Sequence, residues 1–424
     1  MRVPPSHRDA AQLHGQEFAI DPAAAYLAIR RRHGPVAPVL LDGDIPAWLV
    51  LAYREVHQVT SNPQLFGRDS RRWNMRDQIP PGWPLLPFVT WDPTVVYAEG
   101  EEHQRRAGGI GDALDSVDQA ELARICQRTA DQLIDIFIRD GKADLIAQYA
   151  RQLPIRVMAR LYGLREDEIP GIAADLLTAD AQGADPRSAG TRSTDPRGPG
   201  AREAYERTVG RMNQLVSDLR GQPGIGLASQ LVNHPSAGSN EELAMDMYTV
   251  LVNAQQPTAD WIGNTLRLML TDDHFSLLLQ GGRSSADYAL TEVLWKDPPV
   301  QNVLGRWAVR DCELGGRRIR EGDLVILGLA AANADPQVRP DSFSEAGANR
   351  AHMSFAHGEH SCPEAATEMA EIIARTAVEV FLDRMPDAEL AVAPEALHWR
   401  QPEAVRGLAS LPVTFTPATA AKDR

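Results

Sequence analysis

One cysteine of this chain stands where a loop of small and polar residues leads into a helix. Cys362 lies in the segment Ser354–Pro363, and a helical pattern runs from about Cys362 to Arg384. Backbone N–H groups at a helix start and the helix dipole stabilise a thiolate, which can act as a nucleophile or as a soft metal ligand. The alternative is an inert, buried cysteine, and the residues of the loop alone leave both open.

The composition narrows the classes of function. The chain has 424 residues and a net charge of -14, from Asp+Glu 57 against Lys+Arg 43, which argues against nucleic acid as the main partner. Its cysteines, Cys126, Cys312 and Cys362, have no spacing typical of a disulfide framework or a zinc site. Neither a signal-peptide pattern nor a long apolar run is present, so we expect a cytoplasmic protein without a membrane anchor.

The N-terminal part predicts strands followed by a long loop. Val36–Leu41 and Trp48–Tyr53 flank a Gly-Asp turn and predict a hairpin, with short extended runs throughout 37–60. The stretch Phe66–Tyr97 has no clear period but contains several Trp, Leu and Phe residues, so we expect a loop that buries itself, over a ligand or against the core.

Helical patterns follow from Glu101 to about Gly163 and again from Glu166 to Ala181. Residues 183–201 are rich in Gly, Pro and Ser and predict a mobile surface loop, which either gates an entrance or only connects two helices.

A long helix is expected from Asn240, as its cap, to about Leu270, although Pro257 lies inside it. A proline there removes one backbone hydrogen bond and costs about 3 kcal/mol unless something compensates, and such exceptions often mark sites. Further along, Val303–Val309 and Leu324–Leu329 predict strands around a Gly315-Gly316 turn.

The cysteine loop resembles that of cytochromes P450, usually written F-G-x-G-x-H-x-C-x-G. The matching residues are Phe355, Gly358, His360 and Cys362, whereas Ala356 and Glu364 replace the first and the last glycine. The resemblance extends from about Asp21 to Thr414 and includes Arg32-His33-Gly34-Pro35-Val36 and Ala331-Ala332-Asn333-Ala334-Asp335-Pro336. It implies a mainly α fold, with residues 1–424 forming a single large helical domain that has a small β-sheet region.

The same resemblance implies haem b (iron protoporphyrin IX) as the cofactor, with Cys362 as the axial iron ligand and with Phe355 and Ala254 among the residues against the haem. Haem propionates need cationic or hydrogen-bonding partners, and the family's positions for them match His103, Arg306 and His360. The family also carries an arginine four residues after the first histidine. Residue 107 is Ala here, so Arg106, or else Arg105, is expected to substitute. The alternative for His103 and Arg306 is ordinary surface charge.

The long helix departs from the family's oxygen-binding pattern, [A/G]-G-x-[D/E]-T. Ala254 and Thr258 match, whereas Gln255 replaces the glycine and Pro257 replaces the acid that helps to deliver protons. The resemblance gives Thr258 a catalytic role next to bound dioxygen. Alternatively, its hydroxyl bonds back to a carbonyl of its own helix.

A third departure concerns the family's E-x-x-R motif, in which the Arg has become Trp295. Glu292 is retained, and Arg350 matches the later arginine of that network, so we expect Glu292 to pair with Arg350 and Trp295 to fill the space by packing. Replacing a buried ion network by apolar residues is often neutral for stability.

The resemblance therefore implies a haem-thiolate monooxygenase that oxidises a small or medium apolar molecule with electrons from a ferredoxin-type partner. The alternative is a haem-binding protein of this fold with a peroxide-driven, non-oxygenase or non-catalytic role. Gln255 and Pro257 are the residues that favour the alternative.

Overall fold

The N-terminal hairpin forms around the predicted Gly-Asp turn, but its second strand begins three residues earlier than the predicted Trp48 and a helix follows it. In a computed structural model of the chain, β2 (Val36–Leu41) pairs antiparallel with β3 (Ile45–Val50). The prediction that extended structure continues through residue 60 is wrong, because Tyr53 begins helix α3 (Tyr53–Thr60). Its apolar residues Val56 and Val59 are three apart and both buried, a spacing that suits one face of a helix.

The structure describes residues 4–15, 18, 20–179, 200–272, 284–338, 349–400 and 404–418. The predicted entrance loop 183–201 lies outside these residues except for its last two, Gly200 and Ala201, which lead into helix α8.

The hairpin belongs to a six-stranded mixed sheet with the order β1-β2-β3-β9-β6-β4. Its other strands are β1 (Ala11–Gln12), β4 (Phe66–Gly67), β6 (Asn302–Ala308) and β9 (Leu324–Gly328). The chain between β6 and β9 makes the predicted Gly-Gly turn, which joins β7 (Cys312–Leu314) to β8 (Arg317–Ile319). A third, small sheet contains β5 (Lys142–Asp144), β10 (Glu389–Leu390) and β11 (Pro412–Thr414).

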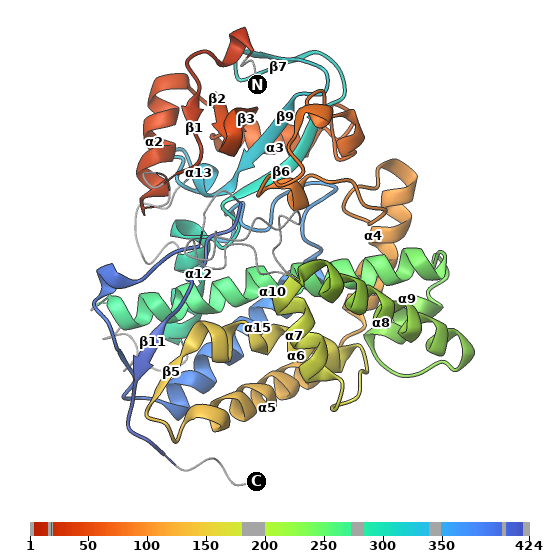
Figure 1. Ribbon diagram of the computed structural model, residues 1–424, viewed down its shortest axis with the longest axis vertical. Coiled ribbons are helices and arrows are strands. Elements are labelled where there is room, and N and C mark those ends of the chain that lie inside the picture. The colour runs from red at the N-terminus through yellow and green to blue at the C-terminus, as the bar shows by residue number, and fades with distance from the viewer. Residues whose placement is uncertain are drawn as a thin grey trace.

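Most of the molecule is helical. Most helices gather at the end opposite the main sheet, whereas α2 (Pro22–His33), α3 and α13 (Leu329–Asn333) lie beside the sheet (Figure 1). The other helices are α4 (Gly100–Asp115), α5 (Gln119–Phe137), α6 (Gln152–Leu161), α7 (Ile169–Ala179), α8 (Ala201–Gly221), α9 (Leu227–Asn233), α10 (Asn240–Thr271), α12 (Ser284–Lys296) and α15 (Glu364–Arg384). A π-helical turn, Ile146–Ala150, precedes α6. No helix in the described part of the chain is long and apolar enough to cross a bilayer.

Helix α10 crosses the molecule and is continuous through Pro257 (Figure 1). Its cap is Ser239, whose hydroxyl accepts a hydrogen bond from the Glu242 amide, so the prediction of Asn240 as the cap is wrong by one residue. A serine side chain suits this role because its oxygen can satisfy a free amide of the first turn.

The apolar stretch 66–97 buries itself, as predicted, in short 3-10 turns against the main sheet. Trp83, Leu85 and Val89 are buried in the same core as strands β2 and β3. The end of the stretch is held near α10, because the Val95 amide donates to the Asp246 carboxylate. The loop thereby connects the sheet to the helical region.

Candidate functional site

The cysteine loop is a tight turn held by its own backbone. The Cys362 amide donates to the carbonyl of Phe355 over 3.0 Å, and the Ser361 amide donates to Gly358. Gly358 has φ +78°, and a Cβ there would collide with the carbonyl of Thr60. Ala356, where the family has a glycine, adopts φ +59°, so the left-handed backbone is kept at a cost of about 1 kcal/mol. The loop therefore forms despite this replacement.

Two neighbours of the loop fix its position. Asn333 donates to the Leu294 carbonyl and accepts from the Met353 amide, which ties α12 and α13 to the start of the loop. Phe355 makes an edge contact with Trp261 of α10, with ring centroids 5.9 Å apart. These contacts place Cys362, which precedes α15 by two residues, on the wall of a cavity of about 580 Å³.

Burial raises the pKa of the Cys362 thiol, and the Thr367 side chain only partly opposes this. The position of Cys362 close to a helix start therefore does not by itself favour the thiolate form of this residue. A coordinated metal cation deprotonates a thiol outright, so a bound iron would supply the missing stabilisation.

Helix α10 forms the cavity wall on another side, where Ala254, Pro257 and Thr258 all line it. The other three threonines of α10, at positions 249, 265 and 271, donate back to a carbonyl of their own helix. Thr258 makes no hydrogen bond to any residue that the structure describes, so its hydroxyl is available to a molecule in the cavity. Gln255, which replaces the family's glycine, is buried but does not line the cavity.

A group of cationic and imidazole side chains lies at a third side. Arg68, His103 and His360 line the cavity, and the rings of His103 and His360 lie 3.9 Å apart. Arg306 of β6 is buried close behind, and its Nη1 has no hydrogen-bond partner among the described residues. Burial and the charges of Arg306 and Arg68 lower the pKa of His360 to about 2. The positive charge at this side of the cavity is therefore only partly balanced by carboxylates of the protein.

One carboxylate, that of Glu359, also lines the cavity, and its Oε1 lies 3.3 Å from His103 Nδ1. With His360 these residues could hold a small metal ion. Such an ion would leave most of the cavity unfilled.

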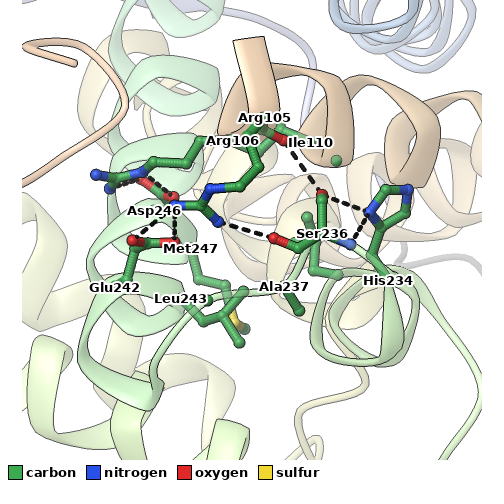
Figure 2. Close-up of a pocket in the computed structure, with 13 residues that line it drawn as sticks. Arg105, Arg106, Ile110, His234, Ser236, Ala237, Glu242, Leu243, Asp246 and Met247 are labelled. Carbon is green, nitrogen blue, oxygen red and sulfur yellow. Dashed lines mark hydrogen bonds and ion pairs between the residues drawn. The ribbon is translucent and has the colours of Figure 1, made fainter. Parts of the chain in front are cut away.

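Arg106 is turned away from the cavity. Its guanidinium donates to both oxygens of Asp246 over 2.6 and 2.9 Å, and also to Glu102 and to the Pro93 carbonyl. Figure 2 shows Arg105 and Arg106 directed toward acidic residues of α10, and Arg105 binds Glu242. The structure therefore does not support either arginine as a propionate partner, because local carboxylates already satisfy both.

The E-x-x-R region also differs from the prediction. Glu292 pairs with Lys296, one turn later on α12, and Arg350 pairs with Glu371 over 3.0 Å, so the predicted Glu292–Arg350 pair does not form. Trp295 is buried, as predicted, and its Nε1 donates to the Asn349 carbonyl over 2.9 Å. A buried indole thus occupies the place of the family's arginine.

The donor set of the cavity fits a haem. A thiol that can become a ligand lies on the wall, the buried Arg306 has an unpartnered N–H group, and the uncompensated positive charge matches two propionates. Sequence reasoning missed Arg68, which lies in a stretch without periodicity; the Ala at position 107 was the only sign that a cation had to come from elsewhere. Fold and site together fit a haem protein in which a cysteine is available as the iron ligand.

Comparison with known proteins agrees. No family model matches the chain. The chain is 30% identical to cytochrome P450 monooxygenase PikC of Streptomyces venezuelae, over 95% of this chain and 92% of the relative. It is 26% identical to a 2-hydroxy-5-methyl-1-naphthoate 7-hydroxylase of Streptomyces carzinostaticus, over 96% and 99%. It superposes on the crystal structure of a myxobacterial cytochrome P450, CYP267B1, in complex with myristic acid, with a TM-score of 0.81, 26% identity and coverage of 95% and 98%.

The chain belongs to the cytochrome P450 family. The predicted mainly helical fold with a small sheet region is confirmed, and so are haem b as the cofactor and the oxidoreductase class. When bound, the haem supplies the activation of dioxygen by which a monooxygenase inserts one oxygen atom into its substrate.

Proposed function

We propose that this monooxygenase oxidises a small or medium apolar molecule and receives electrons from a ferredoxin-type donor. The observation that carries the proposal is the free hydroxyl of Thr258 on the wall that also holds Cys362. In this proposal Cys362 ligates the iron, and His103, His360 and Arg306 hold the propionates. Phe355 and Ala254 pack against the macrocycle, and Thr258 holds a proton next to the reacting oxygen.

The lining supports an apolar substrate. Beyond the cysteine loop and the cationic wall, most of the side chains that face the cavity are aliphatic, including Val95, Val96, Val250, Val300 and Val303. Such a wall binds apolar surface and penalises a ligand whose polar groups find no partner. The names of two similar proteins mention a naphthoate and myristic acid, both with large apolar parts. The ferredoxin-type donor rests on the resemblance to soluble bacterial members of the family.

The test is the yield of product per electron. The purified protein would be screened with apolar ligands for a haem spin-state shift and then supplied with a nicotinamide cofactor, a reductase and a surrogate ferredoxin. We expect substrate-dependent cofactor consumption, and Thr258→Ala should lower product per cofactor about 10-fold or more. Thr265→Ala is the matched control, because Thr265 lies on the same helix but bonds to the Trp261 carbonyl. Equal yields in both variants would contradict the role of Thr258.

A second candidate, peroxide-driven oxidation, is favoured by Pro257. It lines the cavity at the position of the family's acid and cannot carry a proton. Pro257→Glu should then raise product per electron with reductase and dioxygen but leave the rate with hydrogen peroxide nearly unchanged. If the wild-type protein already couples electrons to product efficiently, another group relays the protons and this candidate is wrong. A protein that binds haem but forms product with neither oxidant would instead have a non-catalytic role.

A further inference from the structure

We propose that Arg68 binds a haem propionate and replaces the arginine that the family carries one helical turn after His103. The inference rests on haem b as the cofactor and does not depend on the proposed substrate or electron donor. It adds a binding residue from the loop that follows strand β4, a segment in which the sequence patterns did not single out Arg68.

Arg68 is buried and rigidly held. Its Nε donates to the carbonyl of Val96 over 3.0 Å, and its Nη1 donates to the carbonyls of Leu304 and Gly305 over 3.1 and 2.6 Å. These bonds use three of the five donors of a guanidinium. Nη2 makes no hydrogen bond within the described ranges, and the side chain lines the cavity. Two donors are therefore left for a ligand.

The guanidinium of Arg68 forms no ion pair in the described structure. All three of its hydrogen-bond acceptors are neutral carbonyl oxygens, and it also contacts the ring of Tyr97, whose centre lies 5.7 Å from Cζ. The nearby carboxylate of Glu99 accepts from the Arg68 backbone amide and pairs with Arg72 over 2.7 Å. A buried charge without a partner is costly, so such a site is expected to receive an anion.

Arg306 is a second buried cation that strengthens the expectation of an anion at this site. It is buried, its Nη1 lacks a partner, and the charge of Arg68 adds to burial in lowering the pKa of Arg306. Two buried guanidinium groups that form no ion pair among the described residues, next to one cavity, match a ligand with two carboxylates better than a single small anion. The propionates of haem b provide this pair of charges.

The sequence explains why the role has moved. Ala107 lies one turn after His103 on α4 and lines the same cavity, so a longer side chain there would reach into the cavity, but alanine has only a methyl group. The adjacent Arg106 is held by Asp246 of α10. Arg68 approaches the cavity from the sheet side and supplies the missing cation.

The experiment measures haem release rather than activity. Ferric holoprotein would be mixed with excess apomyoglobin, and the transfer of haem followed at the Soret band. Arg68→Leu should release haem about 10- to 100-fold faster, because it loses charge-assisted hydrogen bonds to a carboxylate. The double variant Arg68→Leu/Ala107→Arg should restore most of the difference, because it returns the cation to the family's position.

Arg105→Leu is the control, since Arg105 is on the same helix as Ala107 but binds Glu242 and the Ser236 carbonyl. It should release haem at the wild-type rate. Arg68→Lys keeps the charge but loses the planar fork, so an intermediate rate is expected, and this variant decides the matter if Arg68→Leu does not fold. A wild-type rate for Arg68→Lys and Arg68→Leu, or no recovery in the double variant, would overturn the proposal. Neither result would affect the proposed substrate or donor.

Discussion

The buried pair Arg106–Asp246 is expected to stabilise the contact between α4 and α10 strongly. The side chains are only 3% and 7% exposed, and Asp246 accepts two hydrogen bonds from Arg106 and one from the Val95 amide. Removing one partner of such a pair leaves a buried charge and typically costs about 3–5 kcal/mol. We therefore expect that loss in the free energy of unfolding for Arg106→Leu and for Asp246→Leu.

The double variant Arg106→Leu/Asp246→Leu should lose far less than the sum of the two changes. No buried charge is left in it, and the two leucines fill much of the volume between the helices, so a net cost of about 0–2 kcal/mol is reasonable. The interaction free energy between the positions should then be at least about 4 kcal/mol. Figure 2 shows the two side chains meeting between the helices.

Urea denaturation of the four proteins, followed by circular dichroism, measures these changes. Single variants that each cost under about 1 kcal/mol would show that the pair is screened by solvent, and the reasoning from burial would be refuted. Haem release gives an independent check. If Arg106→Leu and the double variant both released haem much faster than the wild type, and Asp246→Leu did not, then Arg106 would contact the propionates after all.

Three further outcomes are expected. Reduced protein with carbon monoxide should show the red-shifted Soret band of thiolate ligation, and Cys362→Ala should abolish it; a variant that kept the band would have another ligand. Burial and the charge of Arg350 lower the pKa of His352 to about 4. The unfolded chain therefore takes up the proton first, and stability should fall as the pH drops from 6.5 to about 4, by at most about 3 kcal/mol. His352→Gln should flatten urea midpoints measured across that range, and an unchanged slope would exclude His352 as the cause. Trp295→Ala should cost about 3–5 kcal/mol in the same denaturation assay, because it empties a buried site and removes the bond to Asn349. A cost under 1 kcal/mol would mean that the indole does not replace the family's arginine network.

Sequence patterns predicted the features that depend on neighbouring residues. The β2–β3 hairpin, the long helix α10 and the loop that presents Cys362 follow from local periodicity and from glycines such as Gly358, whose backbone few other residues can adopt. The boundaries were less certain, as the cap at Ser239 shows, because adjacent Ser and Asn residues are almost equally good caps.

The directions of long polar side chains could not be predicted, because distant partners decide them. Arg106 binds Asp246, which is 140 residues away in the sequence. Glu292 pairs with Lys296 on its own helix and not with Arg350. Arg68 is aimed by three carbonyl groups from two other segments. A family motif predicts which positions of the chain belong to a site, but it does not predict the contacts that orient a flexible side chain there.

The departures from the family pattern fall into two kinds, and the difference bears on function. Ala107, Trp295 and Ala356 each lose a family side chain or glycine, and in each case neighbouring structure takes over: a cation from another segment, a packed indole, or a backbone that keeps its conformation. These three positions concern the binding of haem and the stability of the fold. Pro257 differs, because among the described residues that line the cavity near Thr258 none is acidic except Glu359, which lies beside His103 at the cationic wall. The three compensated positions therefore predict that haem binding is preserved, whereas Pro257 predicts weaker delivery of protons. Haem release and electron coupling should then vary independently among variants of the protein.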